Sequence, residues 1–493
     1  MRPRFLTHGG KYMIRIVYVP LDNRPYHTTW MEKMSKRLSF DLVMYEKNKL
    51  GSLHQKACQK DLLRFLLEEG KTADYIILSM DALLSGGLVQ SRLGQFDLSE
   101  AYQVLDQLKA FKEQYPKVVL YVFDTLMRTT VTTYGYESNH LWRQINRYSR
   151  LQGALYLKPD PALEAELNEL IREIHPKDLI TFLTARNKKH QINRQLIELA
   201  KLGMVDYLTI LQEDCMENGL QKPEQDALMA LIQSFGVSHK VRLYNGTDEG
   251  ALVLLAKIAC EVYKQTPTIH IHQRGRHGLD VVMPYEDRTL RTNLEALLCV
   301  IGIKETTKEQ ASGILSIYTE AEYKTHIEKT SNYYRRPNKD QSYLDYIESI
   351  NECIKSKPTV LVDQLFPNGG STVLLKDIDY LGLSGYHAWN TASNALGSAL
   401  CEWVVVCLTK TKDLNFVKER IIDDAIYQSE VRQAIDEQYA LKRINVFDLK
   451  EHAAEAKEKI GALLSEKVKV FFDDTFEFDL PWNRTFEIEV SMK

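Results

Sequence analysis

The chain of 493 residues is longer than an average domain, and its composition, 44% hydrophobic and 26% charged, is typical of a soluble globular protein. Lys and Arg (63) nearly balance Asp and Glu (66), and a net charge of −3 argues against a nucleic-acid or anionic membrane partner.

The seven cysteines are scattered, odd in number and without a C-x-x-C pair, which favours buried thiols in a reducing compartment over a disulfide framework or a zinc knuckle. Residues 1–12 lack the apolar core of a signal peptide, and the most apolar run, 399–408, is too short to span a bilayer. The sequence therefore predicts a cytoplasmic protein with a disordered tail at residues 1–12. It does not indicate the oligomeric state.

From Met13 onward, short strand-forming runs alternate with helical patterns. Strands are expected at 14–19, 41–45, 75–80, 118–123, 207–212, 241–244, 268–272, 314–318, 358–362 and 380–383. Residues 136–204 are expected to be helical, with Asp160 and Pro161 as a cap and first helical residue, and Asp97 or Ser99 can cap an earlier helix. Charged amphipathic helices are expected over 412–466, and two terminal strands over 468–490.

Strands separated by helices predict an α/β fold with a mainly parallel sheet. Nearly every strand ends in polar residues, as in a barrel whose strand ends share one mouth. In an open doubly wound sheet, only strands near the reversal of strand order supply the site. We therefore favour a (β/α) barrel over an open sheet, although ten strands exceed the eight that close a barrel. The expected domains are a catalytic core at 13–301, its continuation or a second α/β subdomain at 302–411 after a linker near 302–312, and a helical region with a β hairpin at 412–493.

The strongest candidate site follows the strand at 207–212, which runs directly into Glu213 and Asp214. The carboxyl end of a buried strand is where chemistry occurs in α/β folds. Neighbouring carboxylates repel each other, which favours proton retention on one of them and suits a general acid. The alternative is that one acid caps the turn and the other is solvated.

Two other strand ends carry charged residues that are candidates for substrate binding. Asp22 and Arg24 lie in a proline-flanked loop and can bind a sugar hydroxyl pair or a phosphate, or simply cap the turn and pair locally. Asp81 precedes a Gly-Gly segment and Arg92, which can hold an anion, although the glycines can equally serve close packing.

Further candidates follow the next strands. Asp124 and Arg128 can contact substrate, or form an ion pair on one helical turn. The loop after the strand at 241–244 offers three more candidates for substrate contact: Asn245, Asp248 and Glu249. The alternative is that the two acids only stabilise the first turn of a helix through its dipole.

An aromatic residue with amides occurs near the strand end at residue 389. Trp389, Asn390 and Asn394 combine a stacking surface with hydrogen-bonding amides, as in carbohydrate sites, although a buried Trp with a capping Asn is the alternative. His270 and His272 share one face of a strand and can ligate a metal, but no third ligand is evident from spacing. No cofactor is predicted, and a divalent metal stays an open option.

Several long segments resemble a bacterial family of unknown function, domain-of-unknown-function family 4127, over nearly the whole chain. The segments are PLDNRP, SMDALLSGGLVQSR, LQEDCMENGLQKPEQ, NGTDEGA, PYEDRTL, GYHAWNTASNALG and LPWNRTFE. The family has Asp-Asp where this chain has Glu213-Asp214, Asp-Asp-Arg-Pro where it has Asp22-Asn23-Arg24-Pro25, and Gly where Ala388 precedes Trp389. The resemblance implies membership but no activity.

The leading hypothesis is a carbohydrate-active hydrolase, a glycosidase acting on N-acetylated sugars in an oligosaccharide or small-molecule substrate. By analogy with substrate-assisted hexosaminidases, Asp214 would be the general acid and Glu213 would orient the acetamido group. One alternative is a metal-dependent hydrolase, lyase or isomerase with oxygen and nitrogen ligands from Asp22, Asp81, Asp124, Asp248 and His272. A further alternative is a non-catalytic sugar-binding protein. All of these readings expect the strand-end acids to line one cavity.

Overall fold

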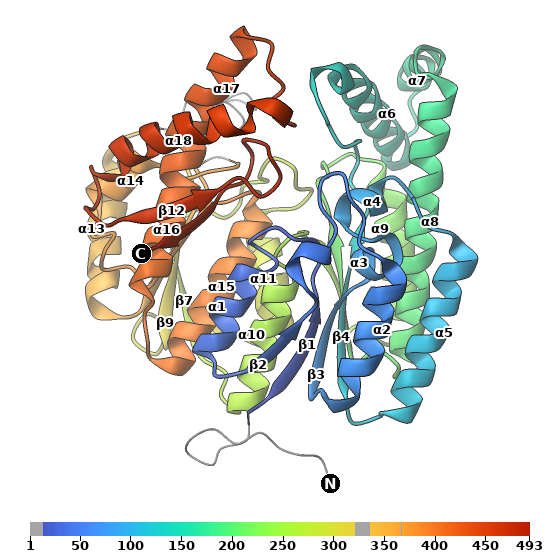
Figure 1. Ribbon diagram of the computed structural model, residues 1–493, viewed down its shortest axis with the longest axis horizontal. Helices are drawn as coiled ribbons and strands as arrows, with labels where there is room; N and C mark the ends of the chain where they lie inside the picture. The colour runs from blue at the N-terminus through green and yellow to red at the C-terminus, as the bar shows by residue number, and fades with distance from the viewer. Residues whose placement is uncertain (1–12, 321–335, 366) are drawn as a thin grey trace. The chain divides into compact units, whose positions relative to one another are not determined.

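The computed structural model describes residues 13–320, 336–365 and 367–493 (Figure 1). The chain divides into two compact units. The first contains the described residues up to Thr133, Glu137–Leu255 and Tyr285–Asp287, and the second contains Tyr134–Tyr136, Ala256–Pro284 and the described part of Arg288–Lys493. The predicted tail at residues 1–12 lies outside the described residues.

The first unit is built on a six-stranded parallel sheet with the order β2-β1-β3-β4-β5-β6. Its strands are β1 (Arg15–Val19), β2 (Asp41–Met44), β3 (Tyr75–Ser79), β4 (Val119–Leu126), β5 (Tyr207–Gln212) and β6 (Val241–Asn245). Because β1 pairs with both β2 and β3, the strand order reverses between β1 and β3.

The helices of the first unit connect these strands. They are α1 (Thr29–Arg37), α2 (Gln59–Glu69), α3 (Met80–Ser85), α4 (Leu88–Arg92), α5 (Leu98–Gln114), α6 (Asn139–Leu157), α7 (Pro161–Glu173), α8 (Pro176–Lys201) and α9 (Gln221–Ser234), while α10 (Gly250–Tyr263) begins in the first unit and ends in the second. Apolar side chains of α2, α5, α8 and α9 pack against alternate residues of the strands, so these helices cover one face of the sheet (Figure 1). The predicted caps Asp97 and Asp160 are confirmed.

The second unit contains a five-stranded parallel sheet with the order β8-β7-β9-β10-β11 and an antiparallel pair, β12 with β13. Its strands are β7 (Thr268–Gln273), β8 (Lys304–Glu305), β9 (Gly313–Tyr318), β10 (Thr359–Asp363), β11 (Gly385–His387), β12 (Phe476–Asp479) and β13 (Glu489–Met492). Its helices are α11 (Leu290–Ile301), α13 (Gln341–Ser356), α14 (Thr372–Asp377), α15 (Ala392–Thr409), α16 (Leu414–Arg420), the π-helix η5 (Ile421–Val431), α17 (Arg432–Leu441) and α18 (Ala453–Val468).

Helix α15 is the core helix of the second unit. Among the described residues it is the one helix whose length and composition would suit a membrane span, but 94% of its 18-residue window is buried inside the protein. Its apolar character is therefore explained by packing within the unit.

The two parallel sheets share one strand order. With the strands of each unit numbered along the chain, both contain the order 2-1-3-4-5 of flavodoxin-like sheets, and β6 extends the first. Ligands of such sheets bind beyond the carboxyl ends of the strands, near the reversal of strand order. In the first unit this point lies between β1 and β3.

The α/β class, the mainly parallel strands and the C-terminal antiparallel segment are confirmed. The favoured barrel is wrong, because the parallel strands of the described residues form two open sheets of six and five strands. Strand ends that share one edge of an open sheet give the same polar pattern as the mouth of a barrel. The structure also places β8 within the predicted linker near 302–312.

One predicted strand lies too early in the chain. Residues 380–383 form a turn, in which the amide of Gly382 donates to Asp379 and that of Leu383 donates to Tyr380. The strand itself is β11, which begins at Gly385.

Candidate functional site

The predicted site residues of the first unit lie at the carboxyl ends of β1, β3, β4, β5 and β6, along one edge of its sheet. Most of them form three polar clusters, which we name the Arg24, Lys189 and Glu213 clusters; the first two are buried and the third is partly exposed. Each cluster joins at least two strand ends.

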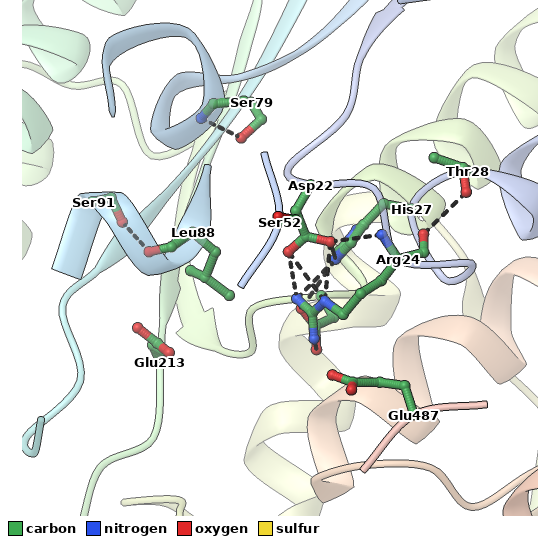
Figure 2. Close-up of polar contacts among 12 residues, drawn as sticks. Asp22, Arg24, His27, Thr28, Ser52, Ser79, Leu88, Ser91, Glu213 and Glu487 are labelled. Carbon is green, nitrogen blue, oxygen red and sulfur yellow. Dashed lines mark hydrogen bonds and ion pairs between the residues drawn. The ribbon is translucent and has the colours of Figure 1, made fainter. Parts of the chain in front are cut away.

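In the Arg24 cluster, Arg24 pairs with Asp22 (Figure 2). It also pairs with Asp248. Its guanidinium lies 2.8 Å from Asp22 Oδ2 and 2.6 Å from Asp248 Oδ1, and His27 Nε2 is 3.1 Å from the same Asp248 oxygen. Burial alone would raise the pKa of Asp248, but Arg24 and His27 hold it below its ordinary value. The cluster therefore ties the loop after β1 to the start of α10 and keeps Asp248 ionised.

The glycines after β3 serve close packing. Gly86 and Gly87 have φ values of 85° and 143°, in the region that favours glycine. A Cβ atom on Gly86 would lie 2.7 Å from the carbonyl oxygen of Ala57, and one on Gly51 would lie closer still to the carbonyl oxygen of Gly86. Of the two readings of this segment, the structure therefore supports packing of the loop at 51–57 against the loop after β3.

In the Lys189 cluster, Lys189 reaches from α8 to the ends of β3 and β4. Its Nζ donates to Asp81 Oδ1 at 2.6 Å and to Asp124 Oδ1 at 2.5 Å, while Asn193 donates to Asp124 Oδ2 at 2.7 Å. Burial raises the pKa of Asp124 to about 7, with Lys189 opposing the rise and Asp81 adding to it. Because all four side chains are buried, we interpret the cluster as an internal support of the site.

In the Glu213 cluster, the two adjacent acids lie in different environments. The Glu213 side chain is 2% exposed; its Oε1 accepts from Arg92 and lies 3.8 Å from Arg128 Nη1. Its Oε2 has no hydrogen-bond partner among the described residues. The Asp214 side chain is 26% exposed and accepts from Arg128. A buried carboxylate with one unpaired oxygen thus lies next to a partly exposed carboxyl group.

The arginines of this cluster are held by more than the two acids. Arg92 also donates to Thr132 Oγ1 at 3.3 Å. Burial lowers the pKa of Arg128, but Asp214, Glu213 and Tyr285 outweigh that effect and raise it above its usual value. The Arg128 guanidinium is therefore charged, and the cluster pairs two arginines with two acids.

The two remaining candidates of the first unit follow β6. Asn245 donates to Cys215 Sγ at 3.2 Å, next to the acidic pair. Glu249 is fully buried, and one of its oxygens accepts from the Thr247 amide at 2.9 Å. Burial raises the pKa of Glu249 to about 8, and the neighbouring Asp248 and Glu286 add to the rise.

Glu249→Gln is expected to remove a pH-dependent loss of stability. Because the folded pKa is about 8 and the unfolded one is about 4.3, the native state binds more protons between these values, and wild-type stability falls as pH rises through this window. Above pH 8 the variant should therefore gain on the order of 5 kcal/mol relative to wild type. Urea unfolding from pH 4.5 to 8.5, read by hydrogen exchange of first-unit amides, would check this. Parallel pH curves for the two proteins would contradict it, and exposed Glu100→Gln is the control.

A three-residue segment, Tyr285–Asp287, completes this side of the first unit. We call it the 285–287 strap, since its flanking residues belong to the second unit. The Tyr285 carbonyl accepts from the Cys215 amide at 2.9 Å, and Asp287 Oδ2 accepts from Gln221, Lys222 and Gln225 at 3.2, 2.9 and 2.8 Å. The strap is therefore fixed directly beside Asp214.

The predicted aromatic and amide residues lie in the second unit. Trp389 is only 5% exposed and packs against Phe486, with ring centroids 6.0 Å apart, and its amide donates to Asp424. Asn394 is also buried, and Asn390 is partly exposed, with its carbonyl accepting from the Asn368 amide at 2.6 Å. Trp389 is therefore a buried packing residue, as the alternative interpretation expected, and does not offer an open stacking surface.

The predicted metal ligands engage protein groups. Asp22 and Asp248 bind Arg24, Asp81 and Asp124 bind Lys189, and His272 contacts Ser316 and Ser349 at 2.8 and 2.9 Å. His270 lies 3.2 Å from the Thr306 carbonyl. No group of three or more His, Cys, Asp or Glu side chains suited to a metal ion occurs within residues 13–320, 336–365 and 367–493.

The comparisons with known proteins identify a family without an activity. A family model described as "Protein of unknown function (DUF4127)" matches residues 16–491. No curated protein matches.

Two solved structures match, both of the Ca. Korarchaeum cryptofilum dinucleotide forming Acetyl-coenzyme A synthetase 1, one in complex with phosphate and ADP and one in the apo form. Their identities are 8% and 9% and their TM-scores 0.18 and 0.19, and each alignment covers 80% of this chain and 96% of the other. At such TM-scores the likeness carries no argument about function.

Proposed function

The chain belongs to the DUF4127 family, and from that premise we propose that it is a carbohydrate-active hydrolase of the glycosidase type whose first unit acts on N-acetylated sugars. The family description assigns no activity, so support comes from the Glu213 cluster. The proposed substrate is an oligosaccharide or a smaller N-acetylated glycoside.

The observation that carries the proposal is the contrast between the two adjacent acids. Glu213 is buried, and its Oε1 faces Arg92 and Arg128 while its Oε2 lacks a hydrogen-bond partner among the described residues. Such an oxygen is costly to leave unpaired, which favours a ligand that donates an N–H or O–H group. Asp214 is accessible from solvent at the same strand end. These environments suit an orienting acceptor and a general acid, respectively.

The proposed reaction uses the acetamido group of the substrate as the nucleophile. When the substrate displaces Arg128, Asp214 takes up a proton from solvent. It gives this proton to the glycosidic oxygen as the bond from that oxygen to C1 breaks, and the acetamido carbonyl oxygen bonds to C1. Glu213 Oε2 accepts from the acetamido N–H and stabilises the positive charge that develops there. Water then attacks C1, releases the acetamido oxygen and returns a proton to Asp214. Arg128, which pairs with Asp214 in the free protein, has to give way to the substrate.

A panel of matched aryl glycosides tests the proposal without mutation. At least one 2-acetamido glycoside should release its aryl group, and the same sugar with a 2-hydroxyl group should react at least ~100-fold more slowly, because it lacks the internal nucleophile. Chelator should leave the rate unchanged. Equal rates for the matched pair would contradict the proposed mechanism.

The same panel separates the alternative functions. Loss of activity with chelator, together with metal by elemental analysis, would favour the metal-dependent hydrolase, lyase or isomerase. A ligand-dependent rise in melting temperature without turnover would favour a sugar-binding protein. Neither alternative has a specific observation in its favour, since the candidate metal ligands are engaged by Arg24, Lys189 and serines.

The proposal includes a cytoplasmic location. All seven cysteines are free, and five of them are buried, as is usual for thiols in a reducing compartment.

A further inference from the structure

The strap beside Asp214 presents an aromatic ring at the edge of the candidate site. Tyr285 is 40% exposed, although its carbonyl is bonded to the Cys215 amide. That hydrogen bond, 2.9 Å long, holds Tyr285 against the residue that directly follows Asp214. An exposed aromatic residue is thereby combined with a firmly held backbone.

The backbone of Tyr285 is in an unusual conformation. Its φ is 68°, in the left-handed region that bulky residues rarely adopt. Such a conformation persists where the surroundings fix it, and here Asp287 and the Tyr285 carbonyl are both held by groups that follow β5. The structure therefore maintains an exposed ring at a conformational cost, which points to a use for that ring.

We propose that Tyr285 is the aromatic surface on which the sugar stacks in the Glu213–Asp214 site. The inference rests on the proposed function and replaces Trp389, whose burial leaves no open ring face. Aromatic rings offer large, rigid contact area at low conformational cost, and binding sites combine them with a few polar groups. Here the polar groups are Glu213 Oε2 and the Asp214 carboxyl.

Tyr285→Asn tests this assignment, because Asn tolerates positive φ and removes the ring. With a reactive 2-acetamido glycoside, KM should rise roughly three- to ten-fold while kcat changes less. Tyr285→Phe and Tyr285→Trp should restore the wild-type KM, since a stacking surface needs a ring but no hydroxyl group. Tyr156→Ala is the matched control, since Tyr156 is 48% exposed on α6.

Direct binding separates failure of this inference from failure of the proposed function. Calorimetric titration with N-acetylglucosamine and N-acetylgalactosamine should show weaker binding to Tyr285→Asn than to wild type. If the sugar binds without turnover and the variant binds it more weakly, the stacking role stands and the hydrolase proposal fails. If turnover occurs but Tyr285→Asn matches the Tyr156→Ala control in KM and binding, the stacking role is overturned. It is also overturned if wild type neither binds nor cleaves any N-acetylated sugar of the panel.

Discussion

Asp214→Asn is expected to lower kcat/KM by about 100- to 10,000-fold for 2-acetamido glycosides with poor leaving groups. For dinitrophenyl glycosides the loss should be much smaller, because a good leaving group departs without a proton. The physical reason is the accessible position of the Asp214 carboxyl, whose side chain is 26% exposed beside the buried Glu213. Steady-state rates across aryl leaving groups of graded basicity measure this dependence.

Glu213→Gln provides the contrast within the same pair. The decrease in kcat/KM caused by Glu213→Gln should be similar for all leaving groups, since the acetamido group participates in every case. Asp226→Asn, which changes an exposed acid bonded to Tyr156, should retain wild-type rates. If Asp214→Asn lost activity equally across the series, Asp214 would not be the general acid.

Lys189→Met is expected to destabilise the first unit by about 3–5 kcal/mol at pH 8. Lys189 is the cation that contacts both Asp81 and Asp124, at 2.6 and 2.5 Å, and all three side chains are nearly inaccessible to solvent. Without it, two buried carboxyl groups face each other uncompensated. Urea unfolding followed by hydrogen exchange in β3 and β4 would report the loss, because the two units need not unfold together.

The effect of Lys189→Met should depend on pH. Burial raises the pKa of Asp124 to about 7. Proton binding to Asp124 therefore removes buried charge, and the destabilisation should shrink as pH falls from 8 to 5. Adding Asp81→Asn and Asp124→Asn should recover much of the lost stability. Lys457→Met removes an exposed pair with Asp479 and should cost less than about 1 kcal/mol. A loss that is constant over this pH range would contradict the assigned role.

Most strand positions and the α/β class were predictable because they depend on local periodicity, although β8 was missed and β11 was placed too early. For example, the mostly apolar run that forms the buried strand β5, and the polar residues that follow it, can be recognised in the sequence. The division into two sheets was not predictable, since each sheet produces the same alternation of strand and helix. Which strand ends share a sheet is decided by tertiary pairing.

The candidate site was predictable only in part, for a similar reason. Asp22, Arg24 and Asp248 stand out at strand ends, and the structure joins them. Lys189 lies in a helix whose sequence shows no sign that this particular lysine points inward. Tyr285 could not be predicted for a different reason. It lies beside Asp214 because a segment of only three residues belongs to the first unit while the residues before and after it belong to the second.

The 285–287 strap also has a consequence for synthesis on the ribosome. Lys222 can form its ion pair with Asp287 only after Asp287, 65 residues later in the chain, has been translated. At ordinary elongation speeds this delay is roughly 3 to 13 seconds. During that interval the nascent first unit lacks the acceptor for Lys222, Gln221 and Gln225, and its Cys215 amide lacks Tyr285. The segment that follows the acidic pair therefore gains these hydrogen bonds only after the strap has been translated.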